Sequence, residues 1–251
     1  MSHTQSTSGD LAYFVAAGPL RYQWAAWWAV RALRRLAGFE GKIVVLSDRH
    51  YVFGDGAQCI TVSVARQVEE AKRLKLRARQ HIDFSAYRRV MFLDSDLVAT
   101  NSLSAVLNRA EQENALVATD DLKHCIGDGF TYRCLDPGEI ELHRQRPGVN
   151  SGFFVAPGKF LAEWLTAWEG VLDATRERVG PGFDQPGLNA CMVRNIFPVA
   201  LEPELMWFPQ IDPEKKLCAA NPSLIHFHGI GRHINRFWRM RTYIRQRLTE
   251  Q

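Results

Sequence analysis

The stretch that most constrains the fold runs from Tyr87 to Leu97, where four consecutive apolar residues lead directly into two carboxylates. Val90–Leu93 is too short for an independent helix and has no polar alternation, so it predicts a central strand buried on both faces. Asp94 and Asp96 follow it. Because ligands of open α/β sheets bind beyond the carboxyl ends of the strands, we expect a ligand site here. The alternative is structural, since acids after a strand often form turns or cap helices.

Strand and helix patterns alternate before this stretch. Apolar runs predict strands at Leu11–Ala16, Lys42–Leu46 and Gln58–Val62, and helical spacing predicts a helix ending near Ala37 and another at Val64–His81. This alternation is typical of an α/β fold with a mostly parallel central sheet wrapped by helices. Right-handed crossovers would place the carboxyl end of every strand at one edge of that sheet.

The length and composition predict one large domain. The 251 residues, 46% hydrophobic and 23% charged, are enough for a single α/β domain with a sizeable core. We expect a disordered polar tail at residues 1–10, the α/β domain at residues 11–231 and a basic amphipathic helix at residues 232–251.

The cysteines and the apolar runs indicate the compartment. The chain has five cysteines, an odd number, and no Cys-x-x-Cys pair, which favours a reducing environment. Residues 1–10 lack the features of a secretion signal. The apolar run Leu11–Leu36 is interrupted by Pro19, Arg21 and Arg31, so it is not expected to span a membrane. We therefore expect a cytoplasmic protein.

Three further polar motifs follow the two acids. In chain order they are Asn150-Ser151-Gly152, then Phe183-Asp184-Gln185 with Leu188-Asn189, then His226-Phe227-His228-Gly229-Ile230-Gly231-Arg232. In this order and at these intervals, the set resembles glycosyltransferase family 8 over about residues 11 to 232. That family contains retaining, metal-dependent enzymes of GT-A fold that use nucleotide-sugars, including glycogenins and bacterial lipopolysaccharide galactosyl- and glucosyltransferases.

The resemblance implies a metal and diphosphate site. Its metal ligands would be Asp94, Asp96 and His226, holding manganese, or alternatively magnesium. Its diphosphate contacts would be Ser95, Lys75, Gly229 and Arg232. Lys75 has a structural alternative as part of a solvated helix face. The family pattern is His-Phe-x-Gly-x-x-Lys followed by Pro-Trp, whereas this chain departs from it with Arg232 and then His233-Ile234.

The resemblance also implies a donor-sugar site, formed by Asp120, Asn150, Ser151, Gly152, Asp184 and Gln185. Asp121 is an alternative to its neighbour Asp120. Asp184 and Gln185 are the catalytic candidates. Asp184 could be the nucleophile of a double displacement or only a helix cap, while Gln185 would support an oxocarbenium-like state during attack on the face of the leaving group.

The expected function is transfer of a hexose, glucose or galactose, from a UDP-sugar to a hydroxyl of a carbohydrate or glycoconjugate acceptor. One rival is a sugar nucleotidyltransferase, but Ala16–Arg21 lacks the glycine-rich basic loop that holds a triphosphate. The other rival is a non-catalytic adaptor that binds a nucleotide-sugar or a membrane surface.

The C-terminal segment has a strong positive charge. Its arginines are Arg232, Arg236, Arg239, Arg241, Arg245 and Arg247, against one acid, Glu250. A basic helix of this kind can lie on an anionic membrane, which would place the protein at the inner face of a membrane. A solvated or oligomer-forming helix is the alternative. Nucleic-acid binding is disfavoured by the acidic crevice.

Residues 122–149 have no clear period and are expected to form a loop over the active site. Four potential zinc ligands occur there, His124, Cys125, Cys134 and His143, but their spacing matches no zinc pattern.

Overall fold

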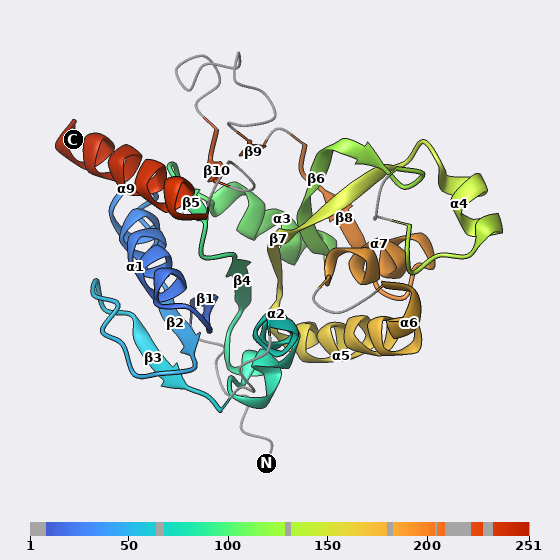
Figure 1. Ribbon diagram of the computed structural model, residues 1–251, viewed down its shortest axis with the longest axis horizontal. Helices are drawn as coiled ribbons and strands as arrows, with labels where there is room; N and C mark the ends of the chain where they lie inside the picture. Colours follow the sequence, from blue (N-terminus) through green and yellow to red (C-terminus); the bar gives the residue numbers. More distant parts are fainter. Residues whose placement is uncertain are drawn as a thin grey trace.

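The computed structural model describes residues 9–63, 68–128, 132–179, 183–203, 205–208, 222–227 and 233–250. Its centre is a seven-stranded sheet in the order β3-β2-β1-β4-β7-β6-β8 (Figure 1). The strands are β1 (Asp10–Ala16), β2 (Lys42–Ser47), β3 (Gln58–Thr61), β4 (Arg89–Leu93), β6 (Leu116–Cys125), β7 (Pro147–Pro157) and β8 (Val199–Leu201). The predicted α/β class is therefore confirmed.

Helices cover both faces of this sheet. One face packs on α1 (Leu20–Arg35), α3 (Ser104–Glu113) and α9 (His233–Thr249), and the other on α2 (Val68–Arg77), α5 (Gly158–Ala174) and α7 (Gln185–Val193). Strand β1 shows the division, because Ala12 and Phe14 belong to the first core, whereas Leu11 and Tyr13 belong to the second. Three shorter helices span Ala78–Gln80, Phe84–Ala86 and Arg176–Val179 (α6).

Strand β7 runs against its neighbours. It is antiparallel to both β4 and β6, whereas the pairs β3-β2, β2-β1, β1-β4 and β6-β8 are parallel. The expectation that every strand ends at one edge is therefore wrong for β7. Because of its reversal, the beginning of β7 lies beside the end of β4, and this brings Asn150–Gly152 to the edge predicted for the ligand site.

A small second sheet extends this edge. It has the order β5-β10-β9, with β5 at Leu97–Ala99, β10 at Leu224–His226 and β9 at Met206–Trp207. Strand β10 is antiparallel to β5, and His226 is the register partner of Leu97. A histidine from late in the chain is thereby placed next to the two acids that follow β4.

The segment expected to form a loop over the active site, residues 122–149, contains regular structure in its described part. Strand β6 continues to Cys125, helix α4 spans Pro137–His143, and β7 starts at Pro147. Register shifts interrupt the pairing of β6 with β7 between Asp120 and Cys125. Helix α4 begins with a capping box in which Asp136 and Glu139 each accept from the other's backbone amide.

The basic C-terminal segment is helical, as predicted, and packs on α1 (Figure 1). Phe237, Met240 and Ile244 on its apolar face are buried in the core, and the Phe237 ring meets the Tyr22 ring edge-on, with 6.0 Å between the ring centres.

The N-terminal tail lies mostly outside the described residues, and β1 already begins at Asp10. Within the described ranges, no helix has the length and apolar character needed to cross a bilayer.

Candidate active site

The two predicted carboxylates lie where β4 ends and β5 begins. The Asp94 amide donates to the Gly152 carbonyl oxygen (2.8 Å), and the Asp96 carbonyl oxygen accepts from the Phe227 amide (3.0 Å). Main-chain bonds to both sheets thus fix the position of each acid.

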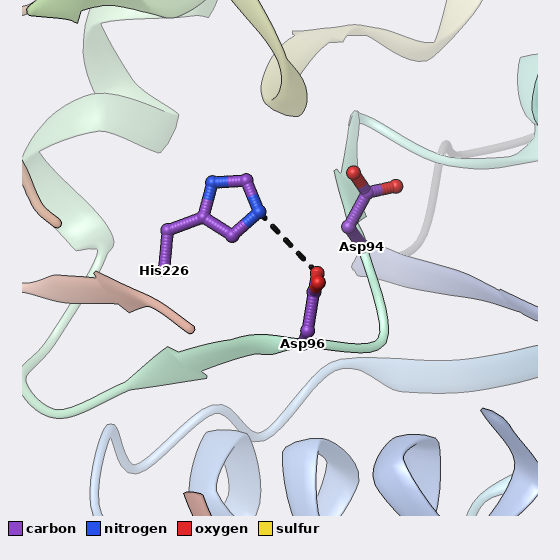
Figure 2. Close-up of side chains that lie close together, drawn as sticks. All are labelled: Asp94, Asp96 and His226. Carbon is purple, nitrogen blue, oxygen red and sulfur yellow. Dashed lines mark ion pairs between the residues drawn. The ribbon is translucent and has the colours of Figure 1, made fainter. Parts of the chain in front are cut away.

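His226 points toward these acids, as Figure 2 shows. One ligand atom each from Asp94, Asp96 and His226 lies within 4.8 Å of the other two. His226 Nε2 is 3.3 Å from Asp96 Oδ1, both side chains are buried, and the Phe208 ring covers the imidazole at 5.1 Å. Two carboxylates and one imidazole form a donor set that suits a divalent first-row cation.

Gly152 keeps the space between these ligands open. A Cβ atom at this position would lie 3.0 Å from Asp94 Oδ2 and 3.2 Å from His226 Cε1. These contacts are closer than ordinary van der Waals contact, so a side chain here would crowd the ligands, which would have to shift by a few tenths of an ångström. The donor set and the space around it both fit a divalent cation.

Lys75 lies beside this group and is buried. Its ammonium forms a short ion pair with Asp184, donates to the Ser151 carbonyl oxygen (2.8 Å) and lies 3.7 Å from Asp94 Oδ1. It also sits 4.6 Å from the centre of the Phe92 ring. The alternative of a solvated helix face is therefore wrong for Lys75, which instead links the metal-type ligands to the second acidic motif.

The charges of this network support one another. Burial lowers the pKa of Lys75, but the carboxylates of Asp184 and Asp94 outweigh burial and raise it. Burial raises the pKa of Asp184, but the Lys75 ammonium outweighs it, so that pKa is lowered. Burial raises the pKa of Asp94 to about 6, with Lys75 opposing the rise and Asp96 adding to it. At neutral pH, Lys75 is therefore a cation between two carboxylates.

Asp184 occupies the N-cap position of α7, yet its side chain makes no capping hydrogen bond. The carboxylate faces Lys75 instead, while the Asp184 carbonyl oxygen accepts from Trp168 Nε1 (2.9 Å). Asp184 therefore holds the N-cap position by its backbone alone. Its carboxylate does not cap the helix and remains at the candidate site.

Gln185 is held from two sides. Its Nε2 donates to Asp121 Oδ2 (2.7 Å), and its Oε1 accepts from the Ser151 amide (3.4 Å). Of the two neighbouring acids on β6, Asp121 therefore contacts Gln185. Asp120 lies half-buried on the same strand.

The amide side chains of Asn150 and Asn189 form hydrogen bonds with main-chain atoms. Asn150 Oδ1 accepts from the Gly152 amide (2.9 Å). Asn189 is fully buried, and its Oδ1 accepts from the Val149 amide (2.8 Å), which joins α7 to the start of β7. Both residues thus hold the turn that presents Ser151 and Gly152.

Arg236 is a site residue that the sequence reasoning missed. This arginine of α9 is buried, and its Nη1 lies 3.2 Å from Asp96 Oδ2. The available signal was its spacing, because Arg236, Met240 and Ile244 recur every four residues and so share the buried face of the helix.

Some predicted residues have less structural support. Gly229 and Arg232 lie outside the described residues, as does the adjoining His228. Ser95 is buried between the two acids.

The alternative of a zinc site in residues 122–149 has no support in the described residues. Cys134 is buried, its thiol lies 3.1 Å from the Thr175 hydroxyl, and the described ranges hold no second group of three metal-type ligands.

The fold matches solved glycosyltransferases along nearly the whole chain. A galactosyltransferase, LgtC, in complex with donor and acceptor sugar analogues, aligns with 94% of this chain and 95% of its own, with a TM-score of 0.65 and 14% identity. GlyE of Streptococcus pneumoniae aligns with 97% of this chain and 63% of its own (TM-score 0.63, 17% identity). The bifunctional glycosyltransferase WbbM aligns with 98% of this chain and 53% of its own (TM-score 0.63, 16% identity).

No protein-family model and no curated protein sequence matches the chain. At these identities the structural matches establish the architecture, which is the GT-A type fold of LgtC. The fold implied by the sequence resemblance is therefore confirmed.

Proposed function

We propose that this chain is a retaining glycosyltransferase that moves a hexose, glucose or galactose, from a UDP-sugar to a hydroxyl of a carbohydrate or glycoconjugate acceptor. The main support is that the ligand atoms of Asp94, Asp96 and His226 lie close together in a GT-A type fold. The buried ion pair of Lys75 with Asp184 lies beside them. LgtC, which shares this fold, has been crystallised with donor and acceptor sugar analogues.

Departure of the nucleoside diphosphate requires positive charge at the leaving oxygens. Asp94, Asp96 and His226 would hold a divalent cation, manganese or alternatively magnesium, which would supply that charge without a proton transfer. Lys75 adds a fixed ammonium next to Asp94, and its raised pKa keeps it charged at neutral pH. Ser95, Gly229 and Arg232 are proposed as further diphosphate contacts, the arginine because a guanidinium can bind two phosphate oxygens.

The sugar would lie on the other side of Lys75, against Asp121, Asp184 and Gln185, with Asp120, Asn150, Ser151 and Gly152 around it. Asp184 is a poor candidate nucleophile because its carboxylate is already paired with a buried ammonium. Asp121 and Ser151 fix the Gln185 amide and thereby orient its carbonyl oxygen. This supports a role for Gln185 in stabilising an oxocarbenium-like state, with the acceptor attacking on the face from which UDP leaves.

The test is UDP release from UDP-glucose and UDP-galactose with Mn²⁺ and a panel of mono- and disaccharide acceptors, with product configuration read by proton NMR. We expect retention of configuration. Substitution Gln185→Ala should lower kcat about 100-fold, as for loss of one transition-state contact. Gln80→Ala, at an exposed position of the helix Ala78–Gln80, is the matched control and should leave the rate unchanged. An inverted product would contradict the proposal.

Mass spectrometry of the quenched enzyme separates the two retaining mechanisms. Same-face attack predicts no sugar adduct on Asp184 at any time point, in wild type or in the Gln185→Ala variant. A covalent hexosyl adduct on Asp184 would make Asp184 the nucleophile. Nucleotide-sugar binding without UDP release would favour the adaptor alternative, and release of pyrophosphate from a nucleoside triphosphate would favour the nucleotidyltransferase.

We also propose that α9 contacts an anionic membrane surface at the cytoplasmic side. Because Phe237, Met240 and Ile244 are buried against the domain, only the outer face remains for lipid, with exposed Arg239 and Arg245. Flotation with anionic vesicles should show binding that the double substitution Arg239→Glu and Arg245→Glu abolishes. Truncation of the helix is a poor test, because it also removes core residues. Unchanged flotation of the double variant would refute this contact.

A further inference from the structure

We propose that Arg236, on the C-terminal helix, positions Asp96 for metal binding, so that docking of α9 completes the metal site. This inference rests on the proposed metal-dependent function and goes beyond it, because Arg236 belongs to none of the motifs that indicated that function.

The two oxygens of Asp96 have different neighbours. Oδ1 lies 3.3 Å from His226 Nε2, on the side of the metal-type ligands, whereas Oδ2 lies 3.2 Å from Arg236 Nη1. An ion pair on Oδ2 fixes the rotation of the carboxylate and directs Oδ1 toward His226. The geometry therefore favours binding of a cation by one Asp96 oxygen, with the other held by the protein.

Arg236 is itself held in place. Its side chain is 9% exposed, and its guanidinium carbon lies 4.8 Å from the centre of the adjacent Phe237 ring, which is buried against α1. Within the described part of the chain, Arg236 Nε is buried and has no hydrogen-bond partner. A buried guanidinium with an unsatisfied nitrogen is costly, and its pairing with Asp96 offsets part of that cost.

The alternative is that Arg236 merely takes the place of a cation and leaves when metal binds. The arrangement argues against this, because Arg236 contacts Asp96 Oδ2 whereas His226 contacts Oδ1, and the packing of Phe237 and Met240 holds the helix that carries Arg236. The two readings predict opposite effects on metal affinity. Loss of a positioning group weakens binding, whereas loss of a competing cation strengthens it.

The experiment is titration of the full chain with Mn²⁺, read by electron paramagnetic resonance of the free ion, without nucleotide and with UDP. Arg236→Gln should weaken Mn²⁺ binding about 10-fold or more, the usual effect of removing a residue that orients a metal ligand. Arg236→Lys keeps the charge without the planar fork and should weaken binding about threefold. Arg247→Gln, at an arginine of the same helix that pairs with Glu250, should bind like wild type.

Leu161→Ala separates positioning from general destabilisation. Leu161 is fully buried on α5, in the core on the other face of the sheet, so its truncation should lower the melting temperature and leave Mn²⁺ affinity unchanged. Circular dichroism establishes that each variant is folded at the titration temperature, and if Arg236→Gln is not, Arg236→Lys carries the test.

Affinity equal to or tighter than that of wild type, in a folded Arg236 variant, overturns this inference alone. Failure of wild type to bind Mn²⁺, even with UDP, overturns the metal-dependent function itself. The two failures are therefore distinguishable.

Discussion

Gly152 shows how little room separates the candidate metal ligands. Substitution Gly152→Ala would place a methyl group 3.0 Å from Asp94 Oδ2 and 3.2 Å from His226 Cε1. We expect Mn²⁺ affinity and UDP release to fall at least about 10-fold, because one ligand must move. Gly170→Ala is the control, since its Cβ would meet nothing within 4 Å on helix α5. Wild-type Mn²⁺ affinity in Gly152→Ala would contradict this account.

Loss of the Lys75 side chain should lower the stability of the domain, because Lys75 is buried in an ion pair with Asp184. Lys75→Met leaves the carboxylate of Asp184 without its buried partner, and urea unfolding should show a loss of about 3 kcal/mol. Lys72→Met, at an exposed position of the same helix, should change the free energy of unfolding by less than about 0.5 kcal/mol. If the two variants unfold alike, the ion pair does not stabilise the domain.

The sequence predicted which residues meet at the site better than it predicted how they meet. Asp94, Asp96 and His226 were expected together, and the structure brings them together. The pairing of Arg236 with Asp96 could not be read from the chain, because it depends on the angle at which α9 docks against α1. The contact of Lys75 with Asp184 likewise depends on the packing of α2 beside the start of α7.

At the scale of elements, the apolar runs predicted a mostly parallel sheet but not the reversed direction of β7. A run of buried residues looks the same whichever way the strand points, so the reversal of β7 had no sequence signal. Strands β5 and β9 of the small sheet also had no sequence signal, because both are too short to show a period. The reversal matters for the site, since it brings the beginning of β7 to the end of β4.

Helix α4 offers a pH-dependent test of an element. Hydrogen bonds from Arg194, with some opposition from burial, lower the pKa of Glu139 from 4.5 to about 2. The carboxylate therefore stabilises the fold above pH 4.5, and this contribution is lost as the pH falls toward 2. Glu139→Gln should cost about 1 kcal/mol at pH 7, since partial exposure screens the pair. The difference from wild type should shrink in urea titrations below pH 4.5.

The control for Glu139 lies on the same helix. Glu141 is mostly exposed. Among the described residues its ion pair is with Arg144, at the C-terminal end of α4. Glu141→Gln should leave the unfolding free energy within about 0.5 kcal/mol of wild type at every pH. A constant deficit for Glu139→Gln across the pH range would show that its charge is not responsible.

At the scale of the whole molecule, ligand binding should raise thermal stability when nucleotide and metal are both present. A ligand at 100 times its Kd stabilises the folded state by about 2.7 kcal/mol. For a chain of this size we expect UDP with Mn²⁺ to raise the Tm by about 5–10 °C. UDP with a chelator, and ADP with Mn²⁺, are the controls and should give smaller shifts. Equal shifts in all three conditions would remove the support for a specific UDP and metal site.

The small sheet β5-β10-β9 also has a consequence for synthesis of the protein. It joins Asp96, from the middle of the chain, to His226, near its end, and α9 then adds Arg236. A nascent polypeptide therefore lacks this ligand set until the ribosome has translated past His226 and Arg236. Residues made early, such as Asp96, have to wait for these later segments to dock before a cation could be held.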